Sequence, residues 1–401
     1  MDDGGPPPRR PLSRRSAFLL GGGLGAGALT AAVASGLGDA AGPGTPSAAA
    51  AEAGPTAPST DPALGLLPVE QFRTDDRDDD ETLAEAVRHA AALTHRPALV
   101  LANRSYVLTR PLLPYSGLHL RAFPFGDEFR HGQRVRLPAG GLLAFDPDVR
   151  SVTLENLSCE VTDHLLAPIP RNASDGAWTD VRVLGGGYTG GTTLIDGAVL
   201  RLSFQPAYVN NVSDSVLRIG GSDSWLFTSG PHYVSGTLPP GRPFLDLDHL
   251  GQSVVGSAYI TAQGGFGVAI RGNATGLVLD GTLVDATHRS GATATQQAGV
   301  QIEGGTDLTL NDLWVFNADV GGESAGQVTV TGGTDIVFTN PRFPGRNGGT
   351  TAADLTGPCI HTTVPITVIA PKAPGRAKLI TATAADLVTL VGAPGWQVRV
   401  P

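Results

Sequence analysis

The feature that most constrains this chain is a strand-and-turn unit that recurs from about residue 150 onward. Each unit is a short strand of alternating apolar residues that ends in one turn-forming residue. These residues are Asn156, Gly185, Asn211, Ser229, Ser257, Gly281, Asp312, Asn340 and Ala370. Successive gaps between them are 29, 26, 18, 28, 24, 31, 28 and 30 residues. Periods of this length are typical of solenoids, and units without a helix predict an all-β parallel β-helix.

The turn residues have a structural meaning in such a coil. A tight turn repeated in every coil needs residues that tolerate positive φ or bond their own backbone, as glycine and small polar residues do. We therefore interpret Asn156, Asn211, Asp312 and Asn340 as a ladder of turns and not as a functional site.

The composition agrees with a large β-protein. The chain has 401 residues, of which 41% are hydrophobic and 16% charged, and 54 glycines accompany many Val, Thr, Leu and Ile residues. The net charge of -9 argues against nucleic acid or an anionic membrane as partners. Cys159 and Cys359 lie about seven coils apart in this register, so we expect free thiols.

The N-terminal region carries an export signal. "RRPLSRRSAFLL" (9–20) places Arg14 and Arg15 before an apolar, small-residue stretch with an A-x-A site at 32–34. It resembles a twin-arginine signal, although Phe18 stands one residue later than usual, so ordinary secretion and an uncleaved anchor stay as alternatives. We expect a signal peptide at 1–40, an Ala/Pro/Gly linker at 41–66 and the β-helix at 67–401, giving a secreted bacterial protein without a membrane partner after processing.

A helix is expected near 79–94, where "DDDETLAEAVRHAAAL" supplies acidic N-cap candidates and apolar residues at helical spacing. This helix, "RSYVLTRPLLPYSGLHLRA" (104–122) and the following coils resemble the pectate-lyase-like superfamily of single-stranded right-handed β-helices. The resemblance implies a right-handed coil whose N-terminal end is plugged by the helix. It implies no single activity, because members include polysaccharide lyases, glycoside hydrolases, epimerases, tail spikes and surface proteins.

A second series of strands indicates a candidate site. Alternation within "VLRLS" (199–203), "VLRIG" (216–220), "FLDLD" (244–248), "GVAIR" (267–271) and "GVQIE" (299–303) predicts two outward columns. One column is Arg201, Arg218, Asp246, Ala269, Gln301 and Thr329; the other is Ser203, Gly220, Asp248, Arg271, Glu303, Thr331 and His361. His249 is expected to point the other way or to lie in a turn.

The functional interpretation of these columns is a polysaccharide groove. Asp246, Asp248 and Glu303 would act as acid and base, since carboxylates about 6.5–9.5 Å apart suit inverting hydrolysis. In a lyase, Arg271 would act beside a uronate carboxylate, and Asp246 and Asp248 would suit calcium. The set Arg218, Arg201, His361 and Gln301 is predicted to bind substrate. The structural alternative is a ladder of ion pairs through Asp248, Arg271 and Glu303.

Family motifs do not decide between these interpretations. Leu247, Asp248 and His249 loosely match the Trp-Ile-Asp-His element of pectate lyases, but no Arg-x-x-Pro-x-x-Arg segment follows, and polygalacturonase motifs are absent. The sequence favours an exported protein that cleaves an extracellular polysaccharide as a lyase or glycoside hydrolase. The alternative is a non-catalytic glycan-binding or structural surface protein. The sequence does not determine the oligomeric state.

Overall fold

The structure is a computed structural model. It describes residues 65–122, 134–169, 176–228, 232–239, 241–263, 265–287, 298–316, 326–344, 357–373 and 378–401. The predicted signal peptide and all but the last two residues of the predicted linker lie outside these ranges. Residues 57–401 make one compact unit, and its first strand is β1 (Leu66–Pro68).

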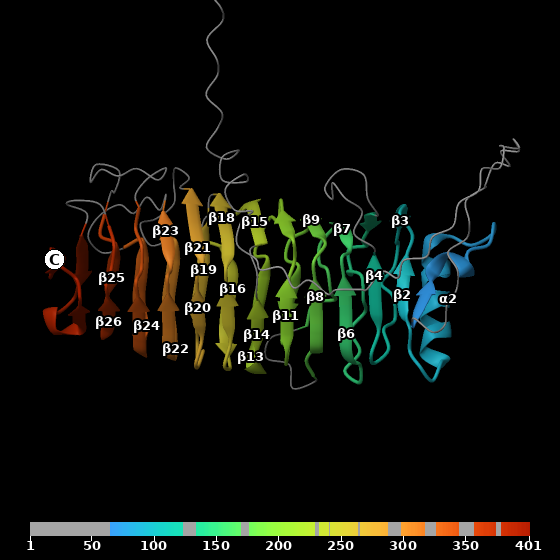
Figure 1. The fold of residues 1–401 in the computed structure, drawn as a ribbon, viewed down its shortest axis with the longest axis horizontal. Coiled ribbons are helices and arrows are strands. Elements are labelled where there is room, and N and C mark those ends of the chain that lie inside the picture. The colour runs from blue at the N-terminus through green and yellow to red at the C-terminus, as the bar shows by residue number, and fades with distance from the viewer. Residues whose placement is uncertain are drawn as a thin grey trace, which may run out of the picture. The chain divides into compact units, whose positions relative to one another are not determined.

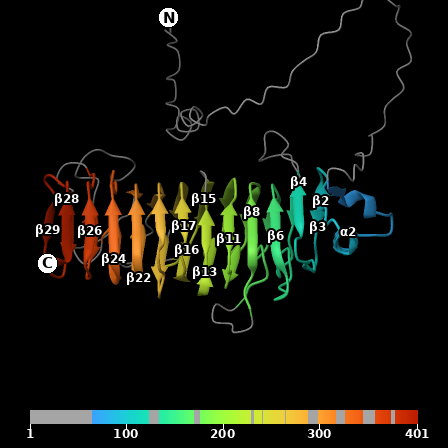
Figure 2. The same ribbon diagram turned by 60° about the horizontal axis from the view of Figure 1, so that its bottom comes forward.

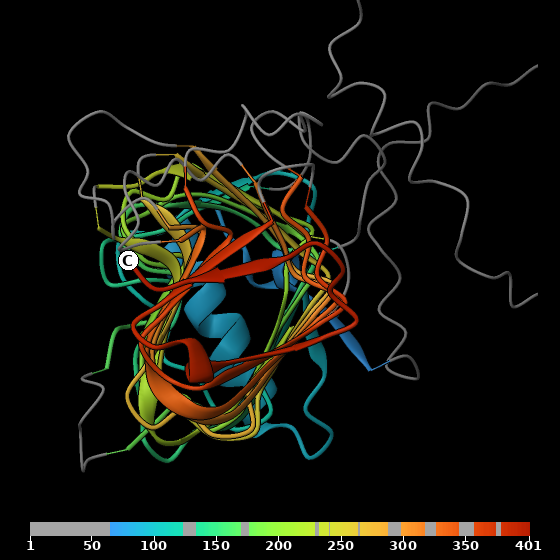
Figure 3. The same ribbon diagram turned by 90° about the vertical axis from the view of Figure 1, so that its left-hand side faces the viewer.

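The described residues form the predicted right-handed parallel β-helix, since every strand pairing is parallel (Figure 1). Strands of three kinds follow one another around each coil and stack into three walls. Figure 3 looks along the coil and shows the walls enclosing a common interior.

The first wall begins with isolated bridges at Leu112, Leu143 and Leu166. Its strands are β10 (Ile195–Gly197), β13 (Leu217–Ser224), β16 (Pro243–Leu250), β19 (Phe266–Arg271), the first parts of β22 (Val300–Asn311) and β24 (Val328–Thr339), β25 (Ile360–Thr362), β27 (Leu379–Ala382) and β29 (Gln397–Arg399).

The second wall is visible as a row of strands in Figure 2. Its strands are β1, β2 (Ala98–Leu101), β4 (His119–Ala122), β6 (Arg150–Glu155), β8 (Thr179–Leu184), β11 (Leu202–Gln205), β14 (Leu226–Thr228), β17 (Val254–Gly256), β20 (Val278–Asp280), the second parts of β22 and β24, β26 (Ile366–Ile369) and β28 (Val388–Val391).

The third wall is a separate sheet of nine strands. Its strands are β3 (Ser105–Val107), β5 (Arg134–Arg136), β7 (Ser158–Val161), β9 (Gly187–Gly190), β12 (Tyr208–Asn210), β15 (His232–Thr237), β18 (Ala258–Gln263), β21 (Leu283–Thr287) and β23 (Trp314–Phe316).

Except for Asn211, which follows β12 and turns from the third wall toward the first, the predicted turn residues within the described ranges join the second wall to the third, and their backbone confirms the prediction of turns. Positive φ values are found at Asn156, Gly185, Asn211, Ser257, Gly281, Asp312, Asn340 and Ala370. Ser229 lies outside the described residues. Asn340 Nδ2 donates to Asp312 Oδ1 on the preceding coil, so at this pair the turn residues also form a side-chain ladder.

The predicted helix is α2 (Asp79–Ala92), which follows the 3-10 turn η2 (Val69–Phe72). Asp78 is its N-cap and accepts a hydrogen bond from the backbone N–H of Glu81 at 2.8 Å. Leu83, Ala86, Val87 and Ala90 of α2 are buried and belong to the same core as the coil. Figure 3 shows the helix across the N-terminal end of the coil, where it covers the apolar interior.

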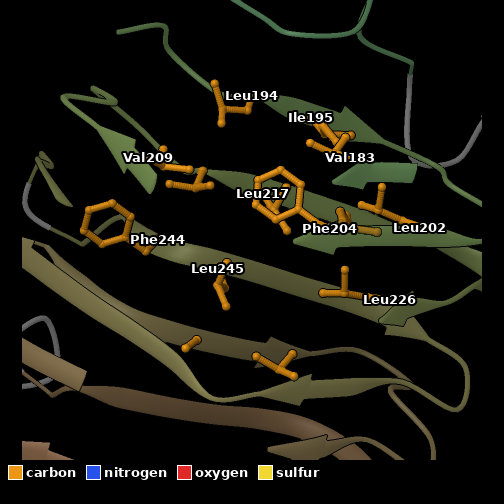
Figure 4. Packing of buried hydrophobic residues seen from close by; sticks show 14 of the residues in the cluster. Val183, Leu194, Ile195, Leu202, Phe204, Val209, Leu217, Leu226, Phe244 and Leu245 are labelled. Atoms are coloured by element: carbon orange, nitrogen blue, oxygen red, sulfur yellow. The ribbon is translucent and has the colours of Figure 1, made fainter. Parts of the chain in front are cut away.

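Apolar residues from all walls meet inside the coil. Residues that pair on neighbouring strands form straight interior rows, as in the second-wall row Leu120, Leu154, Val183 and Phe204. Figure 4 shows Val183, Phe204, Leu217, Leu245 and others pointing into this shared space. A second 3-10 turn, η7 (Ala385–Leu387), precedes β28 near the C-terminal end.

Both cysteines are buried free thiols, as predicted. Burial raises the pKa of Cys159 to about 12 and raises the pKa of Cys359 as well, so neither thiol is a nucleophile at neutral pH. Within the described ranges, no helix has both the length and the apolar character needed to cross a membrane.

Candidate functional site

The outer face of the first wall carries a column of polar residues that runs from strand to strand. Consecutive Cα partners are Asp196, Arg218, Asp246, Ala269, Gln301, Thr329, His361, Thr381 and Arg399. The predicted order from Arg218 to Thr329 is confirmed. We call this set the first column, and the set Gly220, Asp248, Arg271 and Glu303, two residues further along each strand, the second column.

The predicted position of Arg201 is wrong. Leu202 pairs with Val181 and Leu226, so "VLRLS" belongs to the second wall, and Asp196 of β10 stands beside Arg218 instead. The offset of 17 residues from one of these similar runs to the next is too short for a complete coil. Arg201 therefore lies on a different face from Arg218.

The predicted position of His361 is also wrong, by two residues. Ile360 pairs with Val328 and not with Val330, which places His361 in the first column next to Thr329. It is four strand spacings from Asp246, or about 19 Å. Glu303 pairs with Gly332 rather than Thr331, because a bulge follows Ile302.

The first column is buried from Asp246 to Thr381 although it points away from the core. Asp246, Gln301, Thr329 and His361 are each less than 9% exposed, so they do not form the open groove that the alternation predicted. The second column is more open: side-chain exposure is 26% for Asp248, 32% for Arg271 and 44% for Glu303. Any large substrate would therefore meet the second column first.

A chain of ion pairs connects the two columns. Arg218 lies 3.2 Å from Asp196, contacts Asp214 closely, and has its Nε 3.9 Å from Asp246 Oδ2. Arg271 lies 3.3 Å from Asp246 Oδ1 and 3.2 Å from Glu303 Oε2. The carboxylate of Asp246 is thus held between two guanidinium groups.

These contacts explain the electrostatics of Arg218. Burial lowers its pKa, but the hydrogen bond and charge of Asp214, with the charges of Asp196 and Asp246, raise it by more. Arg218 is therefore a permanent cation of the ladder. The predicted ion-pair ladder is therefore present, and its pair between Arg271 and Glu303 is confirmed. The second carboxylate that Arg271 contacts in the pairs described above is Asp246, whereas the predicted ladder named Asp248.

Asp248 and His249 form a pair that sequence reasoning missed. His249 Nδ1 lies 2.5 Å from Asp248 Oδ1, and the imidazole is 48% exposed. The backbone of His249 has φ 51°, which breaks the strand alternation where β16 leaves the first wall for the second. The signal that could have found the pair is the turn itself, since every coil must bend at this corner.

Gly272 makes room for this pair on the next coil. It has φ 58°, and a Cβ at this position would collide with Asp248 Oδ1 and with Cε1 of the His249 ring. The corner above it is also glycine, at Gly304, where a Cβ would strike the backbone of Gly272. His249 is therefore a large side chain at a corner that is occupied by glycine, Gly272 and Gly304, in the next two coils.

These placements determine what chemistry the site can perform. The structure brings together Arg218, Asp246, Asp248, Arg271 and Glu303, to which His249 is added. Among the described residues, no group of three or more His, Cys, Asp or Glu side chains could hold a metal ion. Asp246 is also a poor calcium ligand on physical grounds, because two guanidinium groups already neutralise it.

His361 differs from the residues of this cluster. Its Nδ1 lies 2.9 Å from Thr381 Oγ1, and burial lowers its pKa, so the ring is neutral at neutral pH. Gln301 lies between Ala269 and Thr329 in the buried column. Because Gln301 and His361 are buried, they could bind a substrate only if their side chains became exposed.

Comparison with known proteins adds one structural similarity. No family model and no curated protein sequence matches the chain. The Azotobacter vinelandii mannuronan C-5 epimerase AlgE6 A-module aligns over 83% of this chain and 89% of that chain, with 16% identity and a TM-score of 0.33. A similarity at this score carries no argument about the activity of this chain.

Proposed function

We propose that this protein is a carbohydrate-active β-helix protein that cleaves an extracellular acidic polysaccharide at the first wall. The observation that carries the proposal is the juxtaposition of the exposed His249, held by Asp248, with Arg271 of the next strand. A carboxylate on Nδ1 orients an imidazole and leaves Nε2 to take a proton. Arg271 supplies a cation that suits a uronate carboxylate.

The reaction that fits this set is β-elimination. Arg271 would stabilise the charge that develops on the substrate carboxylate when the neighbouring C–H proton is removed. His249 Nε2 would take that proton, and Asp248 would stabilise the imidazolium formed. The electron pair of the C–H bond forms the C=C bond as the glycosidic C–O bond breaks. The leaving oxygen takes a proton from a water molecule, and the His249 imidazolium returns its proton to the solvent. The product is an unsaturated uronate and a new reducing end.

Hydrolysis is the second catalytic form of the proposal. It would use Asp248 and Glu303, which flank Arg271 on either side along the wall and are both partly exposed. Their separation of about two strand spacings is near the window for inverting hydrolysis. Asp246 is the weaker acid–base candidate, since it is buried and paired with two arginines.

A non-catalytic function has its own supporting observation. Arg218 and Arg271 each contact at least two carboxylates, which is the arrangement of a ladder that stabilises the wall. In that case the face would bind a glycan without cleaving it, or serve only as structure. Export by the N-terminal signal belongs to every form of the proposal. A calcium requirement belongs only to the lyase form.

The test is incubation of residues 51–401 with acidic and neutral polysaccharides, with calcium or with EDTA. Reducing ends and unsaturated-uronate absorbance are followed together. New absorbance is expected with an acidic polysaccharide; reducing ends alone indicate hydrolysis. Turnover in EDTA equal to that in calcium would remove the metal from the proposal.

Variants then test the residues. His249→Gln, Asp248→Asn and Arg271→Lys are expected to reduce turnover by about 100-fold or more. Glu160→Gln is the matched control, because Glu160 is a half-exposed ion-pair carboxylate of β7 on the third wall. Full turnover in Asp248→Asn would end its assignment. Silence of the wild type on every polysaccharide, with retention of one glycan on a column, would favour the binding function.

A further inference from the structure

The second wall carries a patch of exposed aromatic and basic residues that the first-wall site does not use. Trp225 and Phe227 are 37% and 38% exposed, and their rings contact edge to face at 6.4 Å. They are the two aromatic members of the exposed large hydrophobic residues in the described ranges. Val254 follows Phe227 on the next strand and is exposed as well.

Two arginines lie on the adjoining strands of the same face. Arg182 pairs with Ser203, and Ser203 pairs with Phe227, so these side chains form one column across β8, β11 and β14. Arg201 stands directly before Leu202, whose N–H donates to the carbonyl of Trp225. Figure 2 shows β8, β11 and β17 in one row of strands, and β14 pairs with both β11 and β17. We call Arg182, Arg201, Trp225, Phe227 and Val254 the second-wall patch.

The patch has a local excess of positive charge. The side chains of Arg182 and Arg201 are more than half exposed, and their guanidinium groups lie 3.9 and 3.8 Å from the single carboxylate of Asp180. These distances are long for an ion pair and leave the guanidinium donors open to a ligand. The first wall differs, because its arginines are each shared by several carboxylates. In a chain of net charge -9, such a patch selects an anion.

The tryptophan is held in place for stacking. A Cβ at Gly251 would fall against Nε1 and Cδ1 of the Trp225 ring, so the ring lies close against this glycine. Beside Phe227, Gln205 Nε2 donates to Ser203 Oγ at 3.0 Å, adding polar groups to the same face. Fixed aromatic rings bordered by arginine and small polar side chains suit the apolar faces and carboxylates of uronate sugars.

We infer that the second-wall patch is a binding site for an acidic polysaccharide, separate from the first-wall site. Trp225 and Phe227 stack on sugar rings, and Arg182 and Arg201 pair with their carboxylates. The stacked strands would let one chain run along the coil axis, over the roughly 14 Å from β8 to β17. The inference does not require the first wall to be catalytic, since binding is measured without turnover.

The experiment is affinity electrophoresis of residues 51–401 in gels containing polygalacturonate, alginate or dextran. Retardation is expected in the two acidic gels and not in dextran. Trp225→Ala and Arg201→Ala are each expected to weaken retardation about tenfold. Leu113→Ala and Arg136→Ala are matched controls, because both residues are well exposed elsewhere.

Fluorescence gives a second readout of the same site. Trp178 and Trp396 are buried, whereas Trp225 is 37% exposed and Trp314 is partly exposed, so the contribution of Trp225 is taken as the difference in acrylamide quenching between the wild type and Trp225→Ala. Polygalacturonate is expected to protect Trp225 from acrylamide in the wild type and in the Arg136→Ala control.

Several results would overturn the inference. These are no retardation by either acidic glycan, equal retardation by dextran, or retardation lost in Arg271→Lys but kept in Trp225→Ala. Self-association that disappears in Trp225→Ala, without glycan binding, would identify the patch as an interface between copies. If the wild type binds an acidic glycan but does not cleave it, only the catalytic proposal is refuted.

Discussion

The imidazole of His249 is bonded to the carboxylate of Asp248, the residue immediately before it, at 2.5 Å. Neighbours on a regular strand point to opposite faces, so this contact depends on the left-handed backbone of His249. The pair sits over Gly272, where a side chain would collide with it.

Gly272→Ala is therefore expected to displace the pair. Gly281→Ala is the matched control: its φ of 60° equals that of Gly272 within two degrees, but its Cβ would meet nothing closer than 3.8 Å. Backbone strain alone should cost each variant about 1 kcal/mol of unfolding free energy. Gly272→Ala should lose more, and should alone shift the His249 imidazole resonances. Identical spectra for both variants would contradict the collision.

Asp246→Asn should destabilise the coil. The carboxylate is buried between Arg218 and Arg271, and neutralising it leaves their guanidinium groups with one fewer anion each. We expect a loss of about 1–3 kcal/mol in denaturant unfolding, below the range for fully buried pairs because both arginines are partly exposed. Glu160→Gln, in an exposed pair with Arg136, should change the unfolding free energy by less than about 0.5 kcal/mol. Equal effects would show that burial does not strengthen the first-wall ladder.

Glu70 should hold in place the two arginines, Arg73 and Arg104, that both pair with Asp79 of the capping helix. Its carboxylate receives Arg73 at 2.7 Å, Arg104 at 2.9 Å and the hydroxyl of the buried Tyr106 at 2.8 Å. Glu70→Gln is expected to cost about 1–2 kcal/mol, since it weakens three hydrogen bonds to a charged group, all partly exposed. Glu85→Gln, whose partner Arg88 is largely exposed, is the control and should be nearly neutral. Thermal unfolding of both variants is the measurement. An equal loss of stability in the two variants would contradict the expected contribution of Glu70.

His361 should make the stability of the fold depend on pH. Burial lowers its pKa in the folded protein, so the unfolded chain takes up the proton first as the pH falls. Its contribution is complete above the unfolded pKa of about 6.5 and declines as the pH drops toward the folded value. The stability difference between wild type and His361→Gln should therefore shift in favour of the variant as the pH falls below about 6.5. A difference that does not vary with pH would contradict the lowered pKa.

Local patterns were enough to predict the fold. The strand alternation and the turn residues, such as Asn156 and Asn340, are properties of a few consecutive residues, and each backbone conformation follows from its own side chain. The signals for the capping helix were also local. Asp78 caps the backbone N–H of Glu81, three residues on, and the buried apolar residues of α2 follow one another at helical spacing. The strand and turn signals recur along the coil, so an irregular spacing in one coil did not hide the repeat.

Register and exposure were decided by the tertiary structure. "VLRLS" and "VLRIG" have the same alternation on two different walls, so only the path of the coil separates Arg201 from Arg218. His361 was misplaced by two residues because a slip of two keeps every side chain on its own face. The burial of Asp246 and the bend that joins Asp248 to His249 depend on how successive coils stack and turn. The sequence by itself determined a parallel β-helix with its turns and its cap, while the stacking of coils of unequal length decided which charged groups meet.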